Sequence, residues 1–144
     1  MEEWTAPRRL RTLTSWLLAQ SAMASRRLIN EHLDEVGGTR SQFAMLASLE
    51  EFGACSQADL GRRIGLDRSD VAALVADAEA RGWIDRHPDT TDRRRKVLAL
   101  TRAGSERLVT LQALLDSAHD RLLAPLSQRE RAQLIRLLTR LTQR

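Results

Sequence analysis

The chain has 144 residues, of which 42% are hydrophobic and 29% are charged, so it is long enough for one folded domain or for a small binding lobe that carries its own dimerisation helices. The net charge is +4 and the sequence pI is about 10.7, which fits a polyanionic partner without identifying it. The single Cys55 excludes an internal disulfide and a multi-cysteine metal site. Met1 to Arg11 lack the apolar stretch of a signal peptide, and the longest apolar run, Trp16 to Ala19, falls far short of the roughly 20 residues of a membrane span. We therefore expect a soluble, cytoplasmic protein with no membrane contact and no cofactor.

The N-terminal segment from Arg8 to Glu35 contains neither glycine nor proline. Its apolar residues recur every three or four positions, which is the periodicity of an amphipathic helix. We expect one long helix that ends at Gly37-Gly38, because glycine commonly terminates helices. The apolar stripe consists of Leu10, Leu13, Leu17, Ala24 and Leu28, widened by Trp16, Ile29 and Leu33.

A second helix is predicted from the pattern Thr39-Arg40-Ser41-Gln42, which fits a capping box. In such a box the Thr39 hydroxyl accepts from the Gln42 amide, and the Gln42 side chain reaches back to the backbone of Thr39. The helix is expected to end near Phe52-Gly53. Its inward side chains are expected to be Phe43, Leu46, Ala47 and Leu49.

Two short helices follow. Ser56 is the predicted N-cap of a helix that runs to Ile64, Gly65 turns the chain, and Asp67 caps a further helix that runs to Ala80. This pattern suits a helix-turn-helix, whose second helix lies in the major groove of DNA, about 12 Å wide. An ordinary pair of antiparallel helices is the alternative interpretation.

A β-hairpin is predicted next, with strands over Trp83 to His87 and Lys96 to Leu100. Its loop ends in Asp92 followed by four consecutive cations, Arg93 to Lys96. A basic hairpin directly after a helix-turn-helix is typical of a wing that places an arginine in the minor groove. A solvated turn is the alternative, and the preceding helix-turn-helix makes it the weaker one.

Two C-terminal helices complete the chain. Thr101 is the predicted cap of a helix that runs to about Leu123, and Pro125 breaks it. Ser127 and Glu130 fit a second capping box that opens the last helix. The first helix and these two carry more apolar surface than a monomer of this layout can cover, which predicts a homodimer. The apolar residues of the last helix are Leu134, Ile135, Leu137, Leu138 and Leu141.

Several stretches together resemble the MarR family of transcriptional regulators. They are Ser56-Gln57 to Leu60, Leu66 to Val71, Glu79 to Ile84, Asp92-Arg93-Arg94, and Val97 to Gly104, which includes Leu-Thr-x-x-Gly after the second strand. The resemblance implies a mainly α fold with a small β-hairpin wing. It divides the chain into an N-terminal dimerisation helix (1–38), a winged helix-turn-helix DNA-binding domain (39–104) and C-terminal dimerisation helices (105–144). It also implies a homodimer on a palindromic operator, acting as a repressor and released by a small aromatic or phenolic ligand.

The resemblance also assigns roles to particular residues. Arg94 is implied to enter the minor groove, and Asp92 is implied to steady the wing by ion pairing. Arg68, Ser69 and Asp70 are implied to face the major groove. The other predicted DNA contacts are Ser56, Gln57, Arg93, Arg95 and Lys96. Trp16, His32 and Arg40 are candidates to line an effector cleft, although Trp16 on an apolar stripe also fits a core position.

The predicted recognition helix departs from the family because it is acidic. It carries Asp67, Asp70, Asp77 and Glu79 against only Arg68, and Ala73 stands where relatives often have a basic residue. Base reading then depends on few side chains, and affinity on wing and backbone contacts. The Asp70 carboxylate has two interpretations: it accepts from a cytosine amino group, or it stabilises the helix N-terminus through the helix dipole.

Other functional classes fit less well. The three histidines His32, His87 and His119 are scattered, and no nucleophile or metal motif occurs, so we do not expect an enzyme or a metal sensor. A peroxide sensor of this kind uses tyrosine partners, and the chain has no tyrosine. Cys55 is therefore expected to be a small buried hydrophobe. A winged helix that binds protein is a further alternative, which the basic wing disfavours.

Overall fold

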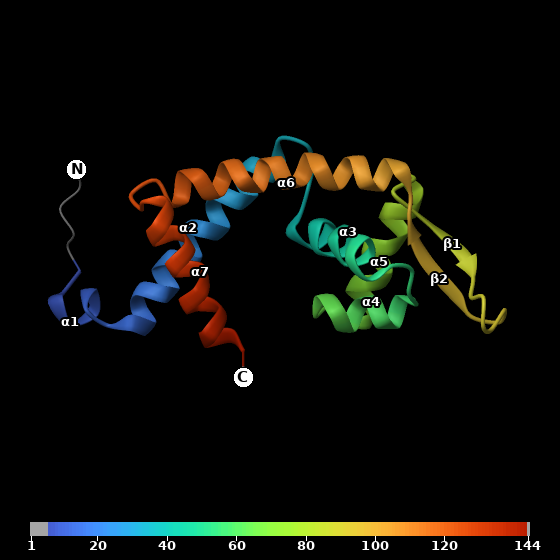
Figure 1. Ribbon diagram of the computed structural model, residues 1–144, viewed down its shortest axis with the longest axis horizontal. Helices are drawn as coiled ribbons and strands as arrows, with labels where there is room; N and C mark the ends of the chain where they lie inside the picture. The colour runs from blue at the N-terminus through green and yellow to red at the C-terminus, as the bar shows by residue number, and fades with distance from the viewer. Residues whose placement is uncertain (1–5, 144) are drawn as a thin grey trace. The chain divides into compact units, whose positions relative to one another are not determined.

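The computed structural model describes residues 6–143, so residues 1–5 and 144, at the outer ends of the two predicted dimerisation segments, lie outside the described part. Within it the protein is mainly α-helical with one two-stranded antiparallel sheet, as predicted (Figure 1). The chain divides into two compact units, one formed by the residues up to His32 and from Asp116 onward, the other by Leu33–Leu115. The elements are α1 (Arg8–Arg11), α2 (Thr14–Asp34), α3 (Arg40–Phe52), α4 (Gln57–Ile64), α5 (Arg68–Ala80), β1 (Ile84–Pro88), β2 (Lys96–Leu100), α6 (Arg102–Leu122) and α7 (Gln128–Thr142).

The N-terminal helix is not continuous, and the prediction of a single helix from Arg8 to Glu35 is wrong at this point. The short α1 ends at Thr12, whose Oγ1 donates to the Arg8 carbonyl at 3.0 Å, and α2 begins at Thr14. Hydroxyl side chains that bond to nearby backbone compete with the helical pattern, and hydrophobic periodicity does not register that competition. The predicted end is confirmed, since Gly37 has a φ of 62° and Gly38 N donates to the Leu33 carbonyl at 2.9 Å.

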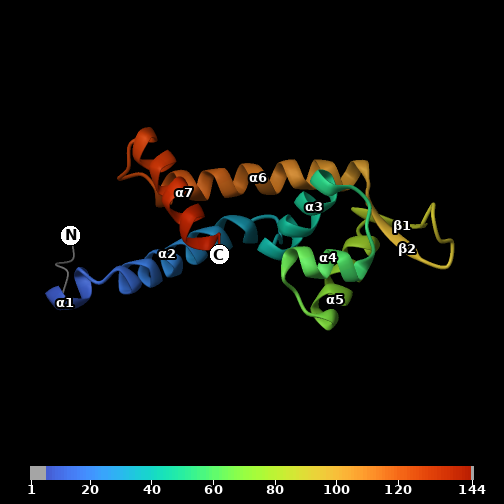
Figure 2. The same cartoon turned by 60° about the horizontal axis from the view of Figure 1, so that its bottom comes forward.

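The unit Leu33–Leu115 has a core of aliphatic side chains. In it α3 contacts α4, α5 and β2, while α5 also contacts α4 and β1. Figure 2 shows α4 and α5 next to each other, with the hairpin beside them. Phe43 and Ala47 are only half-buried, whereas Leu46 and Leu49 are fully inside as predicted. The largest fully buried side chains of this unit are Leu33, Met45, Leu46, Leu60, Val75, Ile84, Leu98 and Leu111.

The predicted capping box at the start of α3 is only half formed. Thr39 Oγ1 accepts from the Gln42 backbone N–H at 3.1 Å, as expected. The Gln42 side chain does not return to Thr39, because its Oε1 accepts from Arg107 Nη2 at 3.4 Å. Arg107 also donates to the Val36 carbonyl at 2.8 Å and stacks over Trp83 at 4.6 Å. A tertiary contact from α6 has thus replaced half of a local motif.

The hairpin has the predicted strands, with its first strand shifted by one residue. Strand β1 starts at Ile84, which pairs with Leu100, and Pro88 pairs with Lys96 at the other end. Trp83 precedes the strand, and its carbonyl lies so close to α6 that a Cβ on Gly104 would meet it at 2.1 Å. This close approach explains why glycine follows Leu-Thr-x-x here.

Cys55 extends the small sheet by one bridge. Its backbone N–H donates to the Leu98 carbonyl at 3.2 Å and its carbonyl accepts from the Leu98 N–H at 2.7 Å. Cys55 is 6% exposed, and burial raises the pKa of its thiol, so the interpretation as a small buried hydrophobe is confirmed. The bridge joins the segment before α4 to the second strand of the hairpin.

The other unit contains α1, most of α2, the end of α6 and α7. The capping box at the start of α7 is complete: Glu130 N donates to Ser127 Oγ at 3.2 Å, and Ser127 N donates to Glu130 Oε1 at 2.9 Å. Arg131 Nη1 pairs with Asp120 Oδ1 at 2.9 Å, which ties α7 to α6. None of the described helices is both long enough and apolar enough to cross a membrane. Many large apolar side chains stay exposed, namely Leu10, Leu13, Leu17, Leu18, Met23, Ile135, Leu137, Leu138 and Leu141.

Candidate nucleic-acid interface

Helices α4 and α5 form the predicted pair, and each begins and ends at the expected residues. Ser56 Oγ accepts from Asp59 N at 3.2 Å at the start of α4, and Gly65 ends it in the left-handed region with a φ of 71°. Asp67 Oδ1 accepts from Asp70 N at 2.9 Å at the start of α5 and from Ser69 Oγ at 3.0 Å. These bonds hold the pKa of Asp67 below its usual value, so the cap is ionised at neutral pH.

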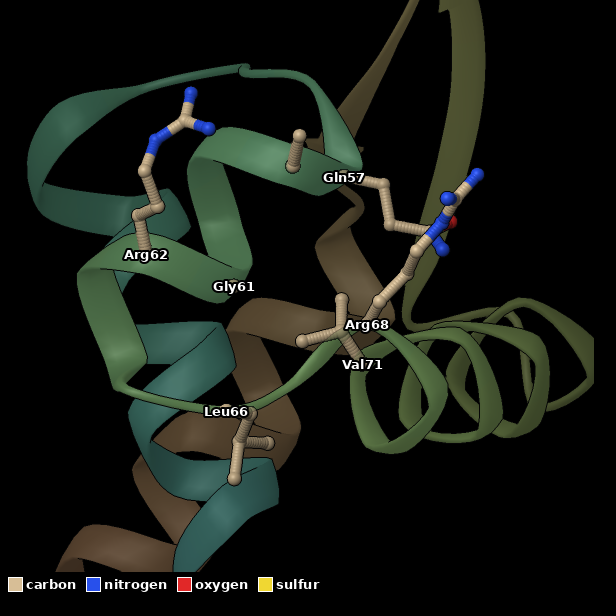
Figure 3. Close-up of a pocket in the computed structure, with 7 residues that line it drawn as sticks. Gln57, Gly61, Arg62, Leu66, Arg68 and Val71 are labelled. Carbon is tan, nitrogen blue, oxygen red and sulfur yellow. The ribbon is translucent and has the colours of Figure 1, made fainter.

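A hollow of about 570 Å³ lies between the two helices (Figure 3). Arg62 of α4 and Arg68 of α5 stand on opposite sides of it. The helices approach closely at Gly61, where a Cβ would lie 2.9 Å from Val71 Cγ2. The result is a concave, partly basic surface that runs along α4 to the first turn of α5. It is lined by Gln57, Ala58, Gly61, Arg62, Leu66, Arg68 and Val71.

The first turn of α5 presents its polar side chains to solvent. Arg68, Ser69 and Asp70 are all exposed, and within residues 6–143 neither Arg68 nor Asp70 enters an ion pair. The acidic character of the helix is largely offset further along. Asp77 pairs with Arg81 at 3.1 Å, and Glu79 pairs with Arg86 at 2.8 Å.

The wing carries one arginine that is almost fully solvent-accessible. Arg94 has a side chain that is 93% exposed, and its Nε lies 3.4 Å from Asp92 Oδ1. The same oxygen accepts from the Arg94 backbone N–H at 3.1 Å. Arg93 and Lys96 are exposed as well. The positive charges of the loop are thus presented outward at Arg93, Arg94 and Lys96.

Arg95 behaves differently from its neighbours. Its Nη2 donates to Ser56 Oγ at 3.1 Å and lies 3.3 Å from Asp59 Oδ2, so the side chain turns back to the first turn of α4. Arg86 of β1 makes a parallel connection, donating from Nη2 to Gln57 Oε1 at 3.0 Å. Sequence reasoning assigned Ser56, Gln57 and Arg95 to DNA and did not single out Asp59 or Arg86 in the site. These contacts span 29 to 39 residues, and no local pattern signals them.

The three candidate effector residues are distributed over the two units. Trp16 and His32 belong to the first unit, and Arg40 belongs to the second. Trp16 is half-buried, and His32 Nδ1 lies 2.8 Å from the Leu28 carbonyl of its own helix. Arg40 helps to line a hollow of about 170 Å³ that also involves Ile64 and Leu66. Their role in binding an effector stays a prediction.

Known proteins place the chain in a family. Residues 37–95 match the model described as the MarR family. A crystal structure of a "probable transcriptional regulator" from Pseudomonas aeruginosa is 34% identical, with a TM-score of 0.78 over 92% of this chain and 99% of that chain. The chain belongs to the MarR family. MarR proteins are transcription regulators and not enzymes.

Two further transcriptional regulators are similar over much of the chain. The PcaV transcriptional regulator of Streptomyces coelicolor, solved in complex with its natural ligand, is 31% identical, with a TM-score of 0.74 over 95% of this chain and 96% of that chain. The transcriptional repressor NicR of Pseudomonas putida is 27% identical over 103 residues, which are 72% of this chain and 65% of NicR. The chain therefore spans slightly less than two thirds of that curated relative's length.

Proposed function

We propose that this MarR-family protein binds a palindromic double-stranded DNA operator as a homodimer and regulates transcription, acting as a repressor. The observation that carries the proposal is the presence of two exposed arginines in one compact unit: Arg68 at the start of α5 and Arg94 in the wing. A capped helix fixes the first, and an Asp92 contact fixes the second. This arrangement offers the Arg68 guanidinium to the major groove and the Arg94 guanidinium to the minor groove.

Each groove would be read by a different chemistry. The Arg68 guanidinium can donate two hydrogen bonds to the O6 and N7 of guanine. The Arg94 guanidinium, exposed and cationic, suits the enhanced negative potential of a narrow minor groove. The hollow beside Arg62 and Arg68 would face the phosphates between these two contacts. Arg93 and Lys96 would add attraction to phosphates without reading the sequence.

The position of Asp70 in the folded chain fits both of its predicted roles. Its exposed carboxylate lies in the first turn of α5, where it is placed to accept from a cytosine amino group and also to stabilise the helix N-terminus. Asp67 already fills the capping position, with two bonds from the same turn. The Asp70 side chain is therefore available to a base, and stabilisation of the helix N-terminus by its charge, which needs no hydrogen bond, is compatible with that contact.

Dimerisation is supported by the apolar side chains that the single chain leaves exposed. Ile135 is 65% exposed and Leu141 is 53% exposed on α7, and Leu13 and Leu17 near the N-terminus are exposed as well. A second copy would bury them through segments 1–38 and 105–144, leaving 39–104 to contact DNA. A two-fold dimer would present two α5 helices about 34 Å apart, one turn of DNA.

Control by a small molecule is part of the proposal. PcaV was solved with its natural ligand, and NicR is named as a repressor. By analogy, a small aromatic or phenolic compound would release this chain from its operator, with Trp16, His32 and Arg40 as candidate contacts. A regulator of this kind would act on the chromosome, which corresponds to the cytoplasmic location expected from the sequence.

Selection from a random pool of DNA duplexes tests the function, since it needs no operator chosen in advance. The duplex recovered with the wild-type chain, called the selected duplex below, is expected to be palindromic. It should bind at least 1,000-fold more tightly than a scrambled copy at physiological salt, roughly the lower bound for specific regulators. A winged helix that binds protein would recover no palindrome and would bind both duplexes alike.

A further inference from the structure

The Arg95 side chain connects the wing to the first turn of α4. Its Nη2 donates to Ser56 Oγ at 3.1 Å and lies 3.3 Å from Asp59 Oδ2. Ser56 is buried, whereas Arg95 keeps a side-chain exposure of 53%. The partners are 39 and 36 residues away in sequence, so these are tertiary contacts and not part of the local turn.

The acceptors of this contact lie at the capped N-terminus of α4 and include a negatively charged side chain. Ser56 Oγ already caps α4 by accepting from Asp59 N. The Ser56 hydroxyl, followed by the Arg62 and Arg95 guanidiniums, holds the pKa of the Asp59 carboxyl below its usual value. Asp59 therefore stays ionised at neutral pH and offers Arg95 a fixed charged acceptor.

The wing end of the contact lies where the hairpin loop closes. The Arg95 carbonyl accepts from Asp89 N at 2.8 Å, and Arg95 N donates to the Asp92 carbonyl at 3.0 Å. Asp92 in turn holds Arg94. A side chain that fixes Arg95 against α4 therefore also fixes the segment that carries Arg94.

We propose that Arg95 is a positioning residue that latches the wing to α4 and so sets where Arg94 meets DNA. The inference rests on the proposed function, because it assigns Arg95 to the protein side of the same interface. The alternative is a direct phosphate contact by Arg95. The latch and the phosphate contact predict opposite roles for Asp59. If Asp59 holds Arg95 in a latch, its carboxylate strengthens operator binding; if Arg95 contacts a phosphate instead, the carboxylate only repels the DNA and weakens binding.

Amide hydrogen exchange without DNA tests the latch itself. In the Arg95→Ala variant the Asp89 amide should exchange roughly fivefold faster than in the wild type, the scale expected for losing an exposed ion pair with its hydrogen bond. Arg93→Ala is the matched control, since Arg93 lies in the same loop and has no ion pair within residues 6–143; it should leave the rate unchanged. An unaltered Asp89 rate in Arg95→Ala overturns the latch, whatever the protein binds.

A double-mutant cycle on the selected duplex tests the positioning role. Arg95→Ala should lose roughly fivefold in affinity in the wild-type background but only about twofold or less in an Asp59→Ala background. Arg62 forms an ion pair with Asp59 and is released by Asp59→Ala, but it is released in both variants that are compared in that background, so its effect cancels. An equal loss in both backgrounds overturns the positioning role in favour of a phosphate contact. A wild-type chain that does not distinguish the selected duplex from its scrambled copy contradicts the proposed function instead, and the exchange result still stands.

Discussion

Asp92 and Arg94 form a two-point contact within the wing. The Asp92 Oδ1 atom accepts from the Arg94 backbone N–H at 3.1 Å and lies 3.4 Å from its Nε. The contact holds the base of the side chain and leaves it 93% exposed. Arg94 is thus oriented by the protein and open to a partner at the same time.

Arg94→Ala should weaken binding to the selected duplex more than Arg93→Ala does. The orienting contact of Arg94 favours insertion into the minor groove, whereas Arg93 would supply only phosphate attraction. We expect a loss of roughly tenfold or more for Arg94→Ala, and a slope of log affinity against log salt that is lower by about one unit. Fluorescence anisotropy at two salt concentrations measures both quantities. Equal losses of affinity for the two variants would mean that the wing acts only as a diffuse cationic patch and that Arg94 has no special role.

Asp92→Ala should weaken binding indirectly, because the carboxylate orients Arg94 and does not itself favour DNA. The loss should be smaller than for Arg94→Ala, and it should largely vanish when Arg94 is already alanine. Anisotropy on the selected duplex gives the three affinities. An Asp92→Ala variant that binds more tightly than the wild type would show that repulsion of phosphates outweighs the orienting contact.

Arg68→Ala should reduce sequence discrimination. A guanidinium that reads a base edge contributes about 1–3 kcal/mol on the operator and much less on unrelated DNA. Ser69→Ala should lose less affinity for the selected duplex than Arg68→Ala, since the Ser69 hydroxyl already donates to Asp67. The affinities of both variants for the selected and scrambled duplexes test this prediction. The same loss on both would make Arg68 a phosphate contact.

The local part of this fold was predictable because caps and turns depend on few neighbouring residues. Ser56, Gly65, Asp67 and the Ser127 capping box all occur as the sequence indicated. The contacts that organise the interface were not predictable in this way. Arg95 was assigned to DNA with its neighbours, since nothing within the loop shows that a flexible side chain reaches a helix 39 residues earlier. Arg107 likewise takes Gln42 from its expected local bond through a contact 65 residues away.

The Asp67 cap should make stability depend on pH in the acid range. Its folded pKa lies below the unfolded value near 3.8, so its contribution is fully present above that value and is lost as the pH falls through the folded pKa. Asp67→Asn keeps an acceptor at the cap but does not titrate in this range. Urea unfolding measured from pH 6 down to pH 3 should therefore show a shallower acid loss for Asp67→Asn than for the wild type. Parallel curves would mean that the Asp67 charge plays no part.

Leu137→Arg should dissociate or unfold the protein, because it would place a charge on the apolar surface proposed to meet a second copy. Gln133→Arg adds the same charge at an exposed position of α7, next to Arg129 and Arg136, and should leave the assembly unchanged. Sedimentation velocity of dilute protein compares the two variants. A stable, folded wild-type monomer would contradict the dimer.

Hydroxyl-radical footprinting of the wild-type chain on the selected duplex tests the central claim most directly. Two winged helix-turn-helix lobes related by two-fold symmetry should protect minor-groove positions on both flanks of the palindrome, around half-sites about 34 Å apart. In Arg94→Ala the flanking protection should fade while the central pattern is kept. A uniform or one-sided footprint, or flanks that remain protected in Arg94→Ala, would contradict a symmetric dimer whose wings enter the minor groove.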